Sequence, residues 1–64
     1  MTDTQYYTAE IHVRTTAGDL VTYYPIHGPG PAGIPATEIR AAAEAAALAQ
    51  EPGGKVEGSR VSRN

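Results

Sequence analysis

Residues 5–16 alternate between apolar and polar side chains, and this alternation constrains the fold more than any other feature of the chain. Tyr7, Ala9, Ile11 and Val13 occupy every second position, and polar or charged residues mostly lie between them. Successive side chains of a β-strand point to opposite faces, so the pattern is typical of a strand with one buried face. The rest of the chain must therefore provide a layer that covers this face.

A β-hairpin is predicted over residues 5–24. Gly18 can adopt the positive φ that a tight turn requires, and the residues after it are rich in β-branched and aromatic side chains. A two-residue loop and a three-residue loop would turn opposite faces of the second strand toward the buried face of the first, and the sequence leaves both open. Apolar groups lie on both of these faces: Leu20 and Tyr24 on one, Val21 and Tyr23 on the other.

The composition then changes to proline and glycine, which predicts an irregular connector over residues 25–35. An alanine-rich helix is expected next, over residues 36–51, with Thr37 as its N-cap. Pro52 and the glycines that follow it end this helix.

One face of the helix is expected to pack on the sheet. Arg40 and Glu44 are four residues apart and therefore share a solvated side. Alanine on the other side permits close approach but buries little apolar area per residue. The face expected to contact the sheet consists of Ala42, Ala45, Ala46 and Ala49, bordered by Ile39 and Leu48.

Residues 55–64 are expected to form either a third strand or a basic tail. Val56 and Val61 are five residues apart, and a bulge at Gly58–Ser59 would return both to one face. A right-handed crossover would place this strand beside the first, in the order 2-1-3. The predicted fold class is α+β, a small ββαβ unit in a single domain over residues 1–64. It consists of a hairpin and one alanine-rich helix packed on a two- to three-stranded, mainly antiparallel sheet.

Bulky apolar side chains are scarce. Apolar residues make up 41% of the 64, many of them are alanine, and Cys, Phe and Trp are absent. Without thiols, neither a disulfide nor a cysteine-ligated zinc can stabilise the fold, so stability is expected to be shared between two chains of a homodimer. The sequence has neither a signal-peptide pattern nor a run of roughly 20 apolar residues, which predicts a cytoplasmic protein with no membrane association.

The segment from Gly28 to Gly33 matches the pattern G-x-G-x-x-G of dinucleotide-binding loops. Pro29 and Pro31 remove two amides that would face a pyrophosphate, which argues against this interpretation. Small-molecule or nucleotide binding here is the third hypothesis for function. Its candidate residues are His27, Gly28, Gly30 and Gly33.

Catalytic and metal-binding patterns are not found in the sequence. His12 and His27 are the only histidines, and no carboxylate lies at a recognisable metal-ligand spacing from them. Ser59 and Ser62 have no base nearby in the sequence. We therefore expect no catalytic residue, no metal, no cofactor and no enzymatic activity.

Basic side chains gather at the C-terminal end, although the whole chain has a net charge of −2. Nucleic-acid binding is accordingly the second hypothesis, with tyrosines available to stack on bases. The candidate contacts are Arg14, Lys55, Arg60 and Arg63.

The tyrosines occur in two adjacent pairs, which places aromatic area on both faces of the sheet. A single helix covers only one of these faces, and tyrosine is enriched in interfaces. The leading hypothesis is a small non-enzymatic interaction or regulatory module, a homodimer that also binds an unidentified protein. Its candidate contact residues are Tyr6, Tyr7, Val21, Tyr23 and Tyr24.

Overall fold

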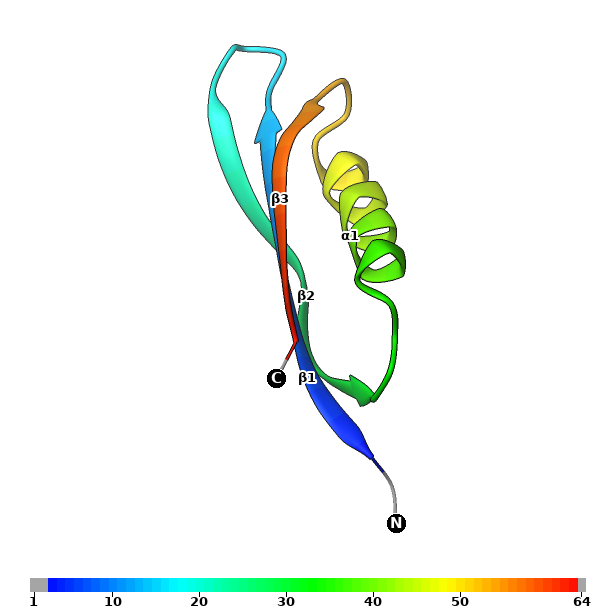
Figure 1. The fold of residues 1–64 in the computed structure, drawn as a ribbon. Coiled ribbons are helices and arrows are strands. Elements are labelled where there is room, and N and C mark those ends of the chain that lie inside the picture. Colours follow the sequence, from blue (N-terminus) through cyan, green and yellow to red (C-terminus); the bar gives the residue numbers. More distant parts are fainter. Residues whose placement is uncertain (1–2, 64) are drawn as a thin grey trace.

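The computed structural model describes residues 3–63, which form an antiparallel sheet with one helix packed on it (Figure 1). The molecule is elongated, with extents of 48 × 16 × 15 Å. The strand order is β2-β1-β3, so both the ββαβ class and the predicted order are confirmed. The elements are β1 (Thr4–Arg14), β2 (Leu20–Pro31), α1 (Ala36–Gln50) and β3 (Lys55–Arg63).

Strand β1 is the centre of the fold, because β2 and β3 both pair with it. Its alternating apolar side chains, Tyr7, Ala9, Ile11 and Val13, are all buried and form the core with residues of α1. The alternation in the sequence therefore predicted the buried face correctly.

A five-residue loop, residues 15–19, joins β1 to β2. Gly18 has a φ of 92°, and its amide donates to the Thr15 carbonyl at 3.0 Å. Val21 pairs with Val13, so the two side chains point to the same face of the sheet. This is the direction predicted for a three-residue loop, because both loops have an odd number of residues. Val21 and Tyr23 consequently face α1, and Leu20 and Tyr24 face the other way.

Strand β2 extends well beyond the predicted hairpin. After a register shift opposite Glu10, its pairing with β1 continues from Ile26 to Pro31, so the predicted irregular connector is wrong for residues 25–31. β2 is an edge strand, and an edge strand accepts prolines whose missing N–H groups face away from the sheet. Only residues 32–35 connect β2 to α1.

The Tyr7 side chain ties β1 to the proline-rich end of β2. A Cβ atom on Gly30 would lie 3.4 Å from the ring carbons of Tyr7. The Tyr7 hydroxyl donates to the Pro31 carbonyl at 2.6 Å and accepts from the Ile34 amide at 3.3 Å. Gly30 thus lies against a ring whose hydroxyl joins β1 to the end of β2 and to the connector.

Helix α1 packs on the sheet through a different face from the one predicted. Its buried residues are Ile39, Ala43 and Ala47. Glu51, at the C-terminal end of the helix, was expected on the solvated side, but it accepts a hydrogen bond from the Tyr23 hydroxyl at 2.8 Å. The residues predicted to be buried are exposed: Ala42, Ala45, Ala46 and Ala49, with Leu48 37% exposed.

The start of α1 also differs from the prediction. Pro35 is the N-cap, and no side chain caps the helix, so Thr37 was the wrong choice. Pro35 begins the helix because its carbonyl accepts hydrogen bonds from the amides of Glu38 and Ile39 at 3.1 and 3.2 Å. No helix in the described part of the chain is long and apolar enough to cross a membrane.

Strand β3 confirms the third-strand alternative over the tail. Val56 pairs with Val13 and Val61 with Ala9, so both valines pack toward α1. The register shift between them leaves Glu57 as the extra residue. The bulge was predicted, but it lies at Glu57 and not at Gly58–Ser59.

Candidate interaction surface

The face of the sheet opposite α1 is not covered by any described element, and we call it the open face (Figure 1). Its large apolar side chains are Tyr6, Leu20 and Tyr24, which are 40%, 50% and 57% exposed. Its other members are Thr8, Glu10, His12 and Arg14 of β1, Thr22 and His27 of β2, and Lys55, Gly58, Arg60 and Ser62 of β3.

The five predicted contact residues do not form one surface. Tyr7 is buried in the core, and Val21 and Tyr23 face α1. Only Tyr6 and Tyr24 lie on the open face, where Leu20 joins them. Leu20 was missed because its direction depends on the loop length, which the sequence did not determine.

One end of the open face is organised by an aromatic pair. The ring of Tyr6 meets the ring of His27 edge-on, with centroids 5.5 Å apart and planes at 84°. The Tyr6 hydroxyl also lies 3.2 Å from Nε2 of His27. This contact joins β1 to β2 and holds both rings in place on the surface.

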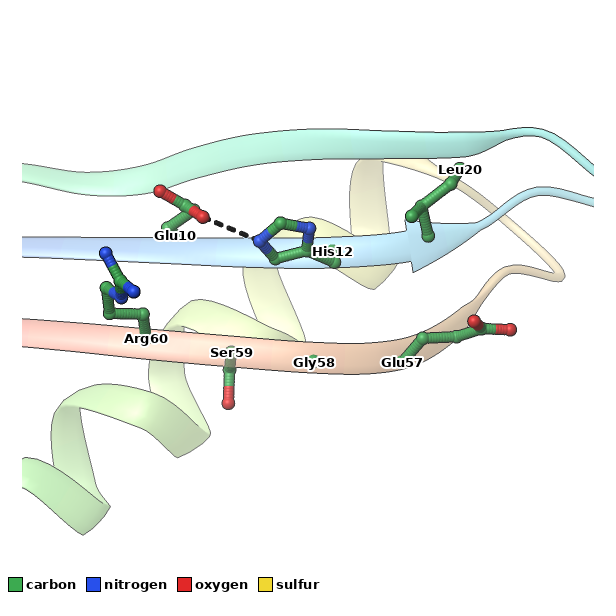
Figure 2. Close-up of a pocket in the computed structure, with 7 residues that line it drawn as sticks. All are labelled: Glu10, His12, Leu20, Glu57, Gly58, Ser59 and Arg60. Carbon is green, nitrogen blue, oxygen red and sulfur yellow. Dashed lines mark hydrogen bonds and ion pairs between the residues drawn. The ribbon is translucent and has the colours of Figure 1, made fainter.

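The middle of the open face is a shallow depression of about 500 Å³, lined by both charged and apolar groups. Nε2 of His12 lies 2.6 Å from Oε2 of Glu10, and Leu20 and Arg60 border this pair (Figure 2). Ser59 also borders the depression, but its side chain points away from Glu10 and His12 (Figure 2). Within residues 3–63, no group of three or more His, Cys, Asp or Glu side chains is placed to hold a metal ion.

An ion pair joins β1 to the bulge of β3. Nε of Arg14 lies 3.1 Å from Oε2 of Glu57, and Nη2 lies 3.2 Å from Oε1, so the contact is bidentate. Nη1 of Arg14 also donates to the Gly18 carbonyl at 2.9 Å. The hydrogen bond from Arg14 lowers the pKa of Glu57; desolvation opposes this, and the charges of Arg14 and Lys55 add smaller lowering effects. The same contact raises the pKa of Arg14.

Replacing Glu57 with glutamine is expected to lower stability at neutral pH and to weaken its acid dependence. The lowered pKa means that the contribution of Glu57 to stability is present above its ordinary pKa of 4.5 and is lost as the pH falls through the folded-state pKa. Urea unfolding of the wild type and E57Q at pH 7 and pH 3 measures this. Glu44→Gln, on the helix, is the matched control. An equal effect of E57Q at both pH values would contradict the prediction.

Three of the four predicted nucleic-acid contacts share the open face. Arg14, Lys55 and Arg60 lie on it, whereas Nη1 of Arg63 donates to the Ile34 carbonyl at 3.1 Å, on the helix side. Acidic side chains lie among the cations, because Glu57 binds Arg14 and Glu10 is the cross-strand neighbour of Arg60. The face is therefore mixed in charge and not a basic patch.

The predicted ligand loop is not a loop over most of its length. His27, Gly28 and Gly30 lie in β2 and pair with Thr8, Tyr7 and Gln5. Gly33 lies in the connector, and Pro35 separates it from α1. A phosphate-binding loop needs its glycine amides at the start of a helix, and these glycines do not lie at one.

The fold and the open face together define a small ββαβ domain with one covered and one uncovered face of its sheet. Comparisons with protein-family models, with curated proteins and with solved structures gave no match.

Proposed function

We propose that this protein is a small, non-enzymatic interaction or regulatory module that acts as a homodimer and binds a protein partner through the open face. One observation carries the proposal: Leu20 and Tyr24, 50% and 57% exposed, lie on a sheet face that α1 does not cover. Large apolar side chains gathered on one exposed face are typical of contact surfaces. Tyrosine contributes contact area at a low entropic cost.

The shape and polarity of the open face also suit a macromolecular partner. Small-molecule sites are usually enclosed, whereas the depression here is shallow and open, with Leu20 beside the charged groups of Glu10 and Arg60. Protein interfaces combine aromatic anchors with polar groups of this kind. We therefore expect the partner to contact Leu20 and Tyr24 with an apolar side chain and the middle of the open face with polar groups.

Nucleic-acid binding is the second candidate function. The placement of Arg14, Lys55 and Arg60 on the same face as the Tyr6 ring supports it, because cations and aromatic rings together bind single strands. However, Arg14 already forms an ion pair with Glu57, and the chain has a net charge of −2. Phosphate affinity would therefore be weak and sensitive to salt.

Replacing Leu20 and Tyr24 with serine is expected to abolish partner binding without unfolding the domain, because both side chains are at least half exposed. The experiment is capture from a lysate of the native cells with tagged wild type, with L20S/Y24S and with Leu48→Ser. Leu48 is 37% exposed on α1 and so provides a matched loss of apolar area on another face. We expect wild type and Leu48→Ser to retain the same partner and L20S/Y24S to lose it.

Two further measurements separate the alternatives. If wild type, L20S/Y24S and Leu48→Ser all captured the same partners, a role for the open face would be contradicted. Gel retardation of single- or double-stranded oligonucleotides at low salt, with no protein captured, would favour the nucleic-acid candidate. A monomer at all micromolar concentrations in sedimentation would contradict the homodimer.

A further inference from the structure

The two edges of the sheet differ in their ability to pair with another strand. β2 carries Pro25, Pro29 and Pro31, and a proline offers no N–H to a neighbouring strand. β3 has no proline over Lys55–Arg63, and only one of its two edges is hydrogen-bonded to another strand, β1. An edge strand with unpaired N–H and C=O groups is a template for a further strand. The edge that remains open for pairing is therefore that of β3.

The side chains of β3 are arranged symmetrically about Ser59. Because of the bulge, Glu57 and Gly58 together occupy one step of the ladder. Val56 and Val61 are then each two steps from Ser59, and both face α1. Glu57 lies one step before Ser59 and Arg60 one step after it, both on the open-face side.

This arrangement is complementary to itself. In an antiparallel pair of β3 strands with a two-fold axis at Ser59, Val56 lies opposite the partner's Val61 on the helix side. On the other side, Glu57 lies opposite the partner's Arg60, and the axis repeats both contacts. Apolar pairs and opposite charges directly across two strands stabilise the pairing. Arg60 forms no ion pair with any of residues 3–63, and Glu57, which binds Arg14, has oxygens that can each accept a second hydrogen bond.

Neighbouring symmetric registers bring like charges together. An axis at Arg60 would place Arg60 opposite itself, and an axis at Glu57 would place Glu57 opposite itself. A slip by one step would turn the valines to the polar side. The charges that protect this edge from indiscriminate pairing thus select a single register.

From this complementarity we infer that β3 pairs antiparallel with β3 of a second copy, in a two-fold dimer centred on Ser59. The inference rests on the proposed homodimer and assigns its interface. Both helices then lie on one side of a continuous sheet, and the two open faces join on the other side. A partner would meet a surface twice as large as that of one chain, with Leu20 and Tyr24 present in both halves.

The test uses charge reversal in the full chain. In Glu57→Arg alone, arginine would face the partner's Arg60 twice, and in Arg60→Glu alone, glutamate would face the partner's Glu57 twice. An equimolar mixture of the two variants restores both opposite-charge contacts in a heterodimer. Sedimentation velocity and native mass spectrometry measure self-association, and circular dichroism confirms folding. Arg40→Glu, on the exposed side of α1, is the matched control.

We expect wild type and Arg40→Glu to dimerise alike, each reversed variant to dimerise at least about tenfold more weakly, and the mixture to recover a heterodimer. Outward-facing amides of β3 should also exchange more slowly as protein concentration rises. A mixture that stays monomeric beside a dimeric wild type would overturn the Ser59 register. A dimer that survives both reversals but is broken by L20S/Y24S would overturn the β3 interface and leave the proposed function standing. A monomeric wild type would overturn both.

Discussion

Replacing Ile11 with alanine is expected to lower the free energy of unfolding by about 3 kcal/mol, within the usual range for such a truncation of roughly 2–5 kcal/mol. Ile11 is fully buried in the central strand, between β2 and β3 and beneath α1. A domain of this size retains only about 3–5 kcal/mol from a single core. The variant should therefore be largely unfolded near physiological temperature. Thermal and urea unfolding followed by circular dichroism measure this loss.

Ile34→Ala is the matched control for this substitution. Ile34 lies in the connector and is only partly buried against the core, so the same chemical change should destabilise the protein much less. If the two variants unfolded at the same urea concentration, the central position assigned to Ile11 would be contradicted.

Replacing Ala43 with leucine is expected to destabilise the protein by about 1–3 kcal/mol, because a larger side chain cannot fit between α1 and the sheet without moving the helix. Ala43 is fully buried there. Ala45→Leu adds the same atoms to the same helix at an exposed position and should change stability by no more than about 0.5 kcal/mol. Thermal unfolding of both variants provides the comparison.

This pair of variants also tests the orientation of the helix. If α1 packed through the face expected from the helical projection, Ala45→Leu would be the more damaging of the two. That result would contradict the burial of Ile39, Ala43 and Ala47 and would indicate that the opposite alanine face is buried.

The strands were predictable because their signals are local. The buried face of β1 follows from alternation alone, and the valines of β3 identified its bulge to within one or two residues. The length of β2 was not predictable in this way. Pro29 and Pro31 normally interrupt a strand, and only the position of β2 at the sheet edge makes them acceptable.

The candidate surface was predicted in kind but not in composition. An uncovered face bearing tyrosine follows from two tyrosine pairs and a single helix. Which of Tyr23 and Tyr24 reaches that face depends on the five-residue loop, and this loop moved Leu20 onto the surface and Tyr23 under the helix. The symmetry of β3 about Ser59 was hidden in the sequence, because it exists only once the bulge has placed Glu57 and Gly58 on one step.

The sequence by itself determined the hairpin, the alanine-rich helix and the need for that helix to cover β1, because alternation, helix propensity and turn residues act over a few neighbouring positions. Tertiary structure alone decided which face of α1 is buried, how far β2 extends and which side chains form the open face. Because alanine occurs on every side of this helix, the rotation of α1 depends on contacts with distant residues, such as the hydrogen bond from Tyr23 to Glu51 at the end of the helix. Those contacts exist only after the chain has folded.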